Sequence, residues 1–507
     1  PNARGYLLLA RTVAMFVNAA LKQTNIVLFL ADDLGWNDAE VNRQAGSTQH
    51  NRPLTPNVRR LRARSISYPN SYASAPVCTP TRTSLMTGRS PGQTRITYWT
   101  LHKDRDTSRP HDQLAAPAWR MNGLNGDDVT LPKLLRDTGF RTIHVGKAHL
   151  AAHGSEGDDL ALLGFDVNIA GHASGAPASY YGEQDFSAAG KAVGAGGQPG
   201  VWDVPGLEKY HGQDIYLTEA LQAEACREMR EAVEAKQPFF LHFAPYAVHT
   251  PIMANERYLE NYPNLDPTEA AYATMVQSVD AALGALLDTL EELGVRENTV
   301  IVFTSDNGGL SAVGRGGQPH THNAPLRSGK GSAYEGGTRV PLVISWPGSR
   351  HHRKSDQAFV SHDLFPTLLS AGGVEIPSSL ADGLEGRDFS SSLSVFGVFA
   401  DGKPLFWNQP HQWGAAGPGI EPFTSIVDGI HKLIYFHAGP RFELYDLKED
   451  LGEAHNLAAE HPNRLKRLAE KLDAWIRTYD VQLSIDKETG GPISLPGAAF
   501  AQMTEPK

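Results

Sequence analysis

The stretch NIVLFLADD, residues 25–33, joins a continuous apolar run to two adjacent carboxylates, Asp32 and Asp33. Apolar runs without alternation are typical of strands that are buried on both faces of a parallel sheet. Strand patterns recur at 140–147, 238–246, 298–306 and 340–347, and helical patterns occur at 56–65, 130–139, 218–236 and 267–294. Strands that alternate with amphipathic helices predict an α/β fold, in which a largely parallel sheet is covered by helices on both faces.

The pattern changes after about residue 385. The stretches PLFWNQPH (404–411), PFTSIVDGIHKLIYF (422–436) and RFELYDL (441–447) are typical of short antiparallel strands joined by turns, and 463–479 is a closing amphipathic helix. We therefore expect three parts. These are an N-terminal segment at 1–23, an α/β domain at 24–385, and a smaller α+β subdomain at 386–507 with a four-stranded antiparallel sheet.

The N-terminal segment has two interpretations. Arg4 and Arg11 precede a short apolar run, and the small residues Ala19 and Ala20 follow it, which is the pattern of a secretory signal remnant. A short surface helix is the other interpretation. A signal remnant favours a periplasmic or secreted protein, and a cytoplasmic protein is the alternative. No run reaches the roughly 18 apolar residues that a transmembrane segment needs.

Composition limits the partners of the chain. The 507 residues carry a formal net charge of −10, which argues against a basic surface for nucleic acid. An anionic small molecule stays possible, because a few local cations can override the overall sign. The two cysteines, Cys78 and Cys226, exclude a disulfide scaffold, and Cys226 lies in a helical run where we expect a buried small residue.

Polar side chains follow four of the predicted strands. Two pairs, Asp32-Asp33 and Asp306-Asn307, come directly after apolar strands. The carboxyl ends of parallel strands meet at one edge of a sheet, where ligand sites gather. Carboxylate and amide oxygens are hard ligands that suit Ca²⁺, or less well Mg²⁺, rather than zinc. The sequence therefore predicts a divalent cation at this edge.

Cations and histidines are expected at the same edge. Arg82, Lys147 and Lys330 would form, with a divalent cation, a pocket for a tetrahedral anion. His149 and His249 can transfer protons near neutral pH. Lys147 and His149 are two residues apart, so an extended backbone would place them on one face.

Several motifs resemble those of one family. CTPTRTSLMTGR (78–89) resembles the sulfatase signature C-x-P-x-R followed by TG, and GFRTIHVGKAH (139–149) resembles the second sulfatase signature. Other stretches match in the same order: ADDLGWND, AVHTP, SDNGG, LRSGKGSAYEGGTRVP, DGIHKLIYF and FELYDLKEDLGEAHNLA. Over residues 24–478 the chain is thus similar to the formylglycine-dependent type I sulfatases of the alkaline phosphatase superfamily. The resemblance implies the family's mixed, mostly parallel sheet.

The resemblance also implies a mechanism. A formylglycine-generating enzyme reads C-x-P-x-R and oxidises Cys78 to Cα-formylglycine, an aldehyde whose hydrate has two hydroxyls. One hydroxyl attacks the sulfate sulfur, and the other, deprotonated by His149, expels sulfate and restores the aldehyde. Under this resemblance Asp32, Asp33, Cys78, Asp306 and Asn307 hold Ca²⁺, and Arg82 pairs with the nucleophile region. Lys147 and Lys330 hold the sulfate, and His249 or Lys330 protonates the leaving alcohol.

The substrate prediction is a sulfate ester of a carbohydrate, with aryl sulfates as artificial substrates. Aromatic and polar residues of an insertion after the nucleophile helix and of the C-terminal part are candidates for a sugar pocket; they are Trp99, His102, Arg105, Trp119, Asn408, His411 and Trp413. Two alternatives stay open. One is a phosphonate monoester or phosphodiester hydrolase of the same superfamily, and the other is an inactive protein that binds sulfated glycans. Nothing in the sequence predicts the oligomeric state.

Overall fold

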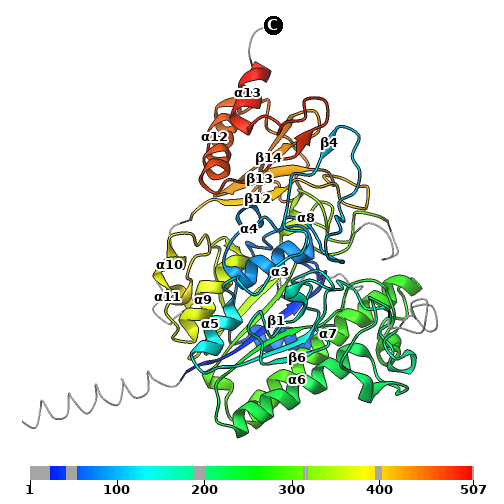
Figure 1. The fold of residues 1–507 in the computed structure, drawn as a ribbon. Coiled ribbons are helices and arrows are strands. Elements are labelled where there is room, and N and C mark those ends of the chain that lie inside the picture. Colours follow the sequence, from blue (N-terminus) through cyan, green and yellow to red (C-terminus); the bar gives the residue numbers. More distant parts are fainter. Residues whose placement is uncertain are drawn as a thin grey trace, which may run out of the picture.

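The computed structural model describes residues 23–41, 54–187, 200–311, 315, 318–393 and 402–504 (Figure 1). The predicted N-terminal segment, 1–23, lies outside these ranges apart from its last residue. The predicted α/β fold is confirmed. Eight strands form one sheet in the order β10-β2-β9-β8-β1-β7-β5-β6.

The centre of this sheet is the strand quoted first. Strand β1 (Asn25–Ala31) pairs in parallel with both β7 (Phe239–Ala244) and β8 (Thr299–Ser305). Strand β5 (Arg141–Gly146) continues the parallel arrangement beside β7. The outer strands are β2 (Ile66–Ser67), β6 (Val167–Ile169), β9 (Leu342–Ser345) and β10 (Arg353–Lys354). Because β9 runs antiparallel to β8 and to β2, the sheet is mixed but mostly parallel.

Burial on both faces explains the unbroken apolar run of β1. Val27 and Phe29 face a core formed with the helices α2 (Pro56–Arg62), α6 (Leu217–Glu234) and α7 (Pro267–Glu292). Ile26, Leu28 and Leu30 face the opposite side of the sheet. They pack in a second core with α3 (Cys78–Thr87), α5 (Leu131–Asp137) and α9 (Leu364–Ala371). Successive strand residues point to opposite faces, so both sets must be apolar.

Helix α7 is long and apolar enough to cross a membrane, but 78% of its most apolar window is buried inside the protein. It serves here as a core helix. Cys226, in α6, is a free and buried thiol that packs in the same core, as predicted.

The C-terminal sheet also matches its prediction. Strands β12 (Leu405–Gln409), β13 (Phe423–Asp428), β14 (His431–Phe436) and β15 (Arg441–Asp446) form an antiparallel sheet in that order. One face packs on α12 (Pro462–Thr478), and the other packs on residues of the large unit that include Tyr72 and Tyr334. In Figure 1 this smaller unit lies at the top of the view, directly above α3, α4 and α8.

Buried charges join the two units. The Lys432 ammonium, on β14, lies 2.9 Å from a carboxylate oxygen of Glu335 and 2.9 Å from one of Glu453. Glu335 opens α8 (Glu335–Thr338) in the large unit. Phe389 and Leu393, beyond the expected boundary at 385/386, still pack in the core of the large sheet.

The remaining elements are short. They are β3 (Ser71–Tyr72), β4 (Leu114–Ala115), β11 (Phe359–Val360), β16 (Ile485–Asp486), α4 (Pro91–Thr94), α10 (Ser378–Ala381), α11 (Ser390–Leu393), α13 (Pro496–Thr504) and the 3₁₀ turns Glu156–Asp158, Gly182–Gln184, Glu208–Tyr210, Glu256–Asn261, Arg296–Asn298 and Ser361–Asp363. Strand β4 lies in the insertion after α4 and pairs with β16. That insertion is therefore tied to the C-terminal part of the chain.

Candidate active site

The site lies where four adjacent strands end. Asp32-Asp33 follow β1, Asp306-Asn307 follow β8, Lys147 and His149 follow β5, and His249 follows β7. These strands are neighbours in the order β8-β1-β7-β5, so their carboxyl ends deliver the side chains to one place. Cys78 is the first residue of α3, and Arg82 lies one turn later on that helix.

Three carboxylates form the centre of the site. Asp32, Asp33 and Asp306 are at most 1% exposed, and each offers an oxygen within 4.8 Å of the others. Asp33 has a φ of 56°, and its backbone N–H donates to Asp306 Oδ1 at 3.2 Å. Asp tolerates this left-handed conformation better than most residues. The hydrogen bond holds the ends of β1 and β8 together.

The fourth predicted oxygen ligand, Asn307, fits the same cluster. Its Nδ2 donates to Asp33 Oδ1 at 2.8 Å. Its Oδ1 is buried and has no hydrogen-bond partner among the described residues. Buried polar atoms without a partner are rare in native proteins. Together with three carboxylates, this free oxygen makes a donor set that fits a hard divalent cation such as Ca²⁺.

Three basic side chains balance the three carboxylates. Lys147 Nζ donates to both oxygens of Asp32, at 2.8 and 2.7 Å, and Lys330 Nζ lies 2.7 Å from Asp33 Oδ1. The Arg82 guanidinium donates through Nε to Asp306 Oδ2 at 2.7 Å. It also donates to the Lys147 carbonyl at 2.8 Å. Arg82 and Lys147 are fully buried, so water does not weaken these interactions.

Burial and the neighbouring cations shift the pKa values of the three carboxyl groups in different directions. Burial raises the pKa of Asp32 well above its ordinary value, and Lys147 only partly offsets it. Burial would do the same to Asp33, but Lys330 and His249 hold its pKa below the ordinary value. Burial is likewise outweighed at Asp306, where Arg82 and Lys147 lower the pKa. The cluster is therefore an acidic site whose charge depends on the surrounding cations.

The two histidines are neutral rings with defined hydrogen bonds. His149 Nε2 lies 2.9 Å from the Thr100 carbonyl, so Nε2 carries the hydrogen, and the buried Nδ1 has no partner among the described residues. His249 Nδ1 lies 2.9 Å from the Thr250 carbonyl, and its Nε2 is 3.8 Å from Asp33 Oδ2. Burial lowers the pKa of His149 well below its ordinary value, with a contribution from Lys147. Burial and Lys330 lower that of His249 to about 3.

The local backbone prediction for Lys147 and His149 was wrong. Strand β5 ends at Gly146, and His149 has a φ of 50°, so the two residues do not share the face of an extended strand. The turn sends them to different layers. His149 lines the cavity that is described next, whereas the Lys147 ammonium lies behind it on Asp32. Lys147 was also predicted to hold sulfate oxygens; its ammonium donates to Asp32 in this structure, and that role stays a prediction.

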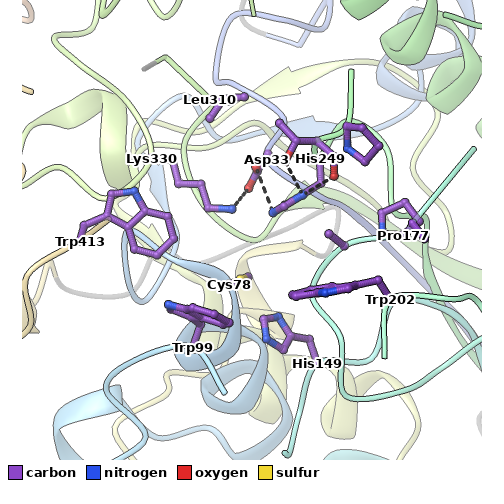
Figure 2. A pocket seen from close by; sticks show the side chains of 15 residues that line it. Asp33, Cys78, Trp99, His149, Pro177, Trp202, His249, Leu310, Lys330 and Trp413 are labelled. Carbon is purple, nitrogen blue, oxygen red and sulfur yellow. Dashed lines mark hydrogen bonds and ion pairs between the residues drawn. The ribbon is translucent and has the colours of Figure 1, made fainter. Parts of the chain in front are cut away.

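A cavity of about 570 Å³ opens over this cluster (Figure 2). Its described lining consists of Asp33, Cys78, Trp99, His149, Gly175, Ala176, Pro177, Ala178, Trp202, His249, Thr250, Pro251, Leu310, Lys330 and Trp413. Cys78, which is 3% exposed, lies among the indole rings and the basic side chains in this view. The predicted nucleophile thus lies in the wall of the cavity and is almost fully buried.

The predicted sugar-binding residues divide into two groups. Trp99 and Trp413 line the cavity, as predicted, although they come from the insertion and from the C-terminal part. His102 and Arg105 are exposed and do not line it. His411 does not line it either. It is 1% exposed, stacks on Tyr98 at 4.7 Å and pairs with the hydroxyls of Thr97 and Ser108.

Two further candidates are structural. Trp119 is buried against His411, and Asn408 Nδ2 donates to the Gln482 carbonyl at 2.9 Å. Sequence reasoning missed Trp202 and the Gly175–Ala178 wall. The backbone N–H of Ala178 donates to the Trp202 carbonyl at 2.7 Å, so this wall is built by contacts between loops. No residue pattern in either loop signals it.

A mixed sheet with a buried cysteine at a helix start and an acidic cluster at the strand ends is the arrangement that the sequence predicted for the alkaline phosphatase superfamily. Family comparison then narrows the class. The family model "Sulfatase" matches residues 24–374, and "N-sulphoglucosamine sulphohydrolase, C-terminal" matches residues 329–480. The chain belongs to the sulfatase family, and it is a sulfuric ester hydrolase.

Comparisons with individual proteins agree with membership of the sulfatase family. A "Sulfatase" of Formosa agariphila is 28% identical over 506 residues, covering 90% of this chain and 89% of that protein. The N-acetylgalactosamine-6-sulfatase of Mus musculus is 31% identical over 404 residues, covering 76% of this chain and 69% of that protein. The crystal structure of Ps i-CgsB in complex with k-i-k-neocarrahexaose has a TM-score of 0.73 at 25% identity, covering 96% of this chain and 98% of that one.

The predicted alternative hydrolase shares the fold. The phosphonate monoester hydrolase of Agrobacterium radiobacter has a TM-score of 0.62 at 20% identity, covering 92% of this chain and 97% of that one. At this identity the likeness concerns the fold alone.

Proposed function

We propose that this enzyme hydrolyses a sulfate ester of a carbohydrate, with Cys78 as the precursor of a Cα-formylglycine nucleophile. The observation that carries the proposal is the convergence of Cys78, Lys330, His149 and His249 on one cavity beside a buried acidic cluster. Two relatives favour a carbohydrate. One is named N-acetylgalactosamine-6-sulfatase, and the other, Ps i-CgsB, was solved with k-i-k-neocarrahexaose.

Two groups absent from the polypeptide would complete the site. The hydrate of formylglycine at position 78 supplies a nucleophilic hydroxyl and a second hydroxyl for release of sulfate. Ca²⁺, held by Asp32, Asp33, Asp306 and Asn307 together with residue 78, supplies positive charge and lowers the pKa of a hydroxyl. A formylglycine-generating enzyme is therefore the partner that the protein needs for maturation.

The side chains of the chain divide the remaining work. Lys330 lines the cavity and is the basic group placed to contact the sulfate oxygens. Arg82 and Lys147 are fully buried, and they fix the acidic cluster and balance its charge. We thus assign Lys147 to charge balance rather than to direct contact with sulfate.

Proton transfer follows from the hydrogen bonds of the rings. His149 is the base, because its Nδ1 has a free lone pair while Nε2–H is held by Thr100. The neutral His249 ring has its hydrogen on Nδ1, toward the Thr250 carbonyl. Two residues, His249 and Lys330, were considered as the proton donor to the leaving alcohol. We assign this role to Lys330, because its ammonium already carries a proton beside the cavity. Burial opposes its charged form, but Asp33 keeps the pKa of Lys330 above its ordinary value.

The first experiment tests the nucleophile. The protein is produced together with a formylglycine-generating enzyme, and mass spectrometry is applied to the peptide that contains Cys78. We expect an aldehyde at position 78 and turnover that needs Ca²⁺ after treatment with a chelator. Cys78→Ala should be folded and inactive. An aldehyde-containing protein that releases no sulfate from any ester, or an active Cys78→Ala, would contradict the proposal.

The second experiment separates the two hydrolase chemistries. The ratio of kcat/KM for an aryl sulfate and for the matching aryl phosphonate monoester should favour the sulfate. A ratio that favours the phosphonate would assign the enzyme to the alternative class.

The third experiment identifies the proton donor. Loss of the acid makes the rate depend more steeply on the acidity of the leaving group. Lys330→Met should therefore lose more activity on sugar sulfates than on activated aryl sulfates, and His249→Gln should show a smaller difference. The reverse order would assign the proton to His249.

A further inference from the structure

The wall of the cavity beyond the acidic cluster is built mainly from three indole rings. Trp99 comes from the insertion after α4, Trp202 from the loop that contacts Ala178, and Trp413 from the segment after β12. In Figure 2, Trp202 and Trp413 lie on opposite sides of Cys78, and Trp99 lies between Trp413 and His149. Trp202 is 36% exposed, so part of its ring is open to solvent.

The Trp413 ring is held in place before any ligand arrives. A Cβ atom on Gly331 would lie 2.4 Å from Trp413 Cδ1, so the ring packs directly on the backbone next to Lys330. Trp413 also meets Tyr98 edge to face at 5.9 Å, and Tyr98 is stacked on His411. His411 therefore supports the wall from behind. Side chains that are fixed in advance lose little entropy on binding.

The same wall carries no charge. Among the described residues that line the cavity, the charged groups are Asp33 and Lys330, and these two pair with each other at 2.7 Å. The rest of the lining away from Cys78 and the histidines is Gly, Ala, Pro, Leu, Thr and Trp. A carboxylate or second sulfate placed against this wall would lose water and gain no cationic partner from the described lining residues.

The indole rings keep some hydrogen-bonding capacity. Within the described part of the chain, the Trp202 and Trp413 N–H groups donate to no acceptor. An indole offers an apolar face and one donor at its edge. That combination suits a ring with an apolar face and neutral hydroxyls.

We propose that the three indole rings form a leaving-group site for a neutral sugar ring that carries a single sulfate ester. The site disfavours rings that bear a carboxylate or a second sulfate beside the ester that is cleaved. This inference rests on the proposed hydrolysis of sulfate esters at position 78, and it specifies the leaving group of that reaction.

The test uses the complete enzyme with formylglycine at position 78. Release of sulfate is measured from three matched esters: a neutral hexose monosulfate, the same hexose with a second sulfate, and a uronic acid monosulfate. An aryl sulfate is the fourth substrate. We expect kcat/KM for the neutral monosulfate to exceed that for either doubly charged ester by at least ~10-fold, because a missing partner for a buried charge costs more than a tenfold factor in affinity.

Variants at the exposed indole connect the preference to the wall. Trp202→Ala should lower kcat/KM for the neutral sugar by about 10-fold, mainly through KM, because truncated aromatic anchors typically cost this much. Trp202→Arg should narrow the gap between the disulfated and monosulfated sugars. Trp346→Ala is the control, since Trp346 directly follows β9, is half-buried against the second core and does not line the cavity.

The outcomes are distinguishable. Equal or better turnover of the doubly charged esters, or a Trp202→Ala variant that matches Trp346→Ala on every substrate, would overturn the inference. Turnover of the aryl sulfate with no turnover of the neutral sugar would also overturn it. Failure of the proposed function itself would appear differently, as no release of sulfate from any of the four esters by protein with the aldehyde at position 78.

Discussion

Replacing Lys147 by methionine tests whether the acidic cluster needs its buried cation. The substitution shortens the unbranched side chain by one atom and removes an ammonium that donates to both oxygens of Asp32 at 2.8 and 2.7 Å. Both residues are 0% exposed. Breaking a buried ion pair by removing one partner costs about 3–5 kcal/mol, because the other charge is left without compensation.

The cost has an upper limit, because Asp32 can take up a proton instead. Protonating a carboxyl group costs about 1.4 kcal/mol for each pH unit above its ordinary pKa of 3.8. At pH 7.5 this limit is about 5 kcal/mol, and at pH 5.3 it is about 2 kcal/mol. The folded pKa of Asp32 is already raised by burial, and it rises further without Lys147. Stability of the variant is therefore retained at low pH and lost as the pH rises above about 4.

The assay is urea unfolding at pH 7.5 and pH 5.3, with a chelator and with excess Ca²⁺. We expect Lys147→Met in chelator to lose at most about 5 kcal/mol at pH 7.5 and at most about 2 kcal/mol at pH 5.3, with the larger loss at pH 7.5. Bound Ca²⁺ should reduce the loss, because it neutralises the same carboxylates.

Lys471→Met is the matched control. Lys471 pairs with Asp428 at 2.6 Å, but its side chain is 42% exposed, so we expect a loss below about 1 kcal/mol with little dependence on pH. The reasoning would be refuted if Lys147→Met unfolded at the same urea concentration as Lys471→Met in chelator at both pH values.

Three further predictions concern other parts of the chain. His437 is 1% exposed, bonds to the hydroxyls of Thr424 and Ser484, and has its pKa lowered by burial to about 3. Because the folded pKa lies below the unfolded value of about 6.5, this ring destabilises the fold as the pH falls below 6.5, by about 2 kcal/mol between pH 7 and pH 5. His437→Gln should therefore show a smaller change of unfolding free energy between these two pH values, and an unchanged difference would contradict the assignment. Gly331→Ala should lower the free energy of unfolding by about 1–2 kcal/mol and remove much of the activity, because Gly331 has a φ of 86° and touches the Trp413 ring. Gly402→Ala is the control. Its added Cβ would lie in open space, so we expect no loss of stability or activity. His149→Ala should lower kcat by about 10²–10⁴-fold with a circular dichroism spectrum like that of the parent, and near-normal turnover would remove His149 from its role as base.

The sequence by itself determined the sheet, the C-terminal subdomain and the edge on which the site lies. The reason is that these depend on local patterns. Unbroken apolar runs such as 25–31 can be satisfied only by burial on both faces, and the residues that follow such strands must meet at one edge. Asp32, Asp33, Asp306 and Asn307 could be brought together on this argument alone.

Only the tertiary structure decided which side chains reach the cavity. His149 turns into it through a left-handed backbone, and Lys147, two residues earlier, is held behind it by Asp32. Trp202 reaches the cavity through contacts between loops, whereas His411 is held behind the wall by Tyr98. These positions depend on residues that are far apart in the chain. Local hydrophobic patterns predict which segments form strands and helices. The walls of a site depend on the packing of loops, and loop sequences have no hydrophobic periodicity from which that packing could be predicted.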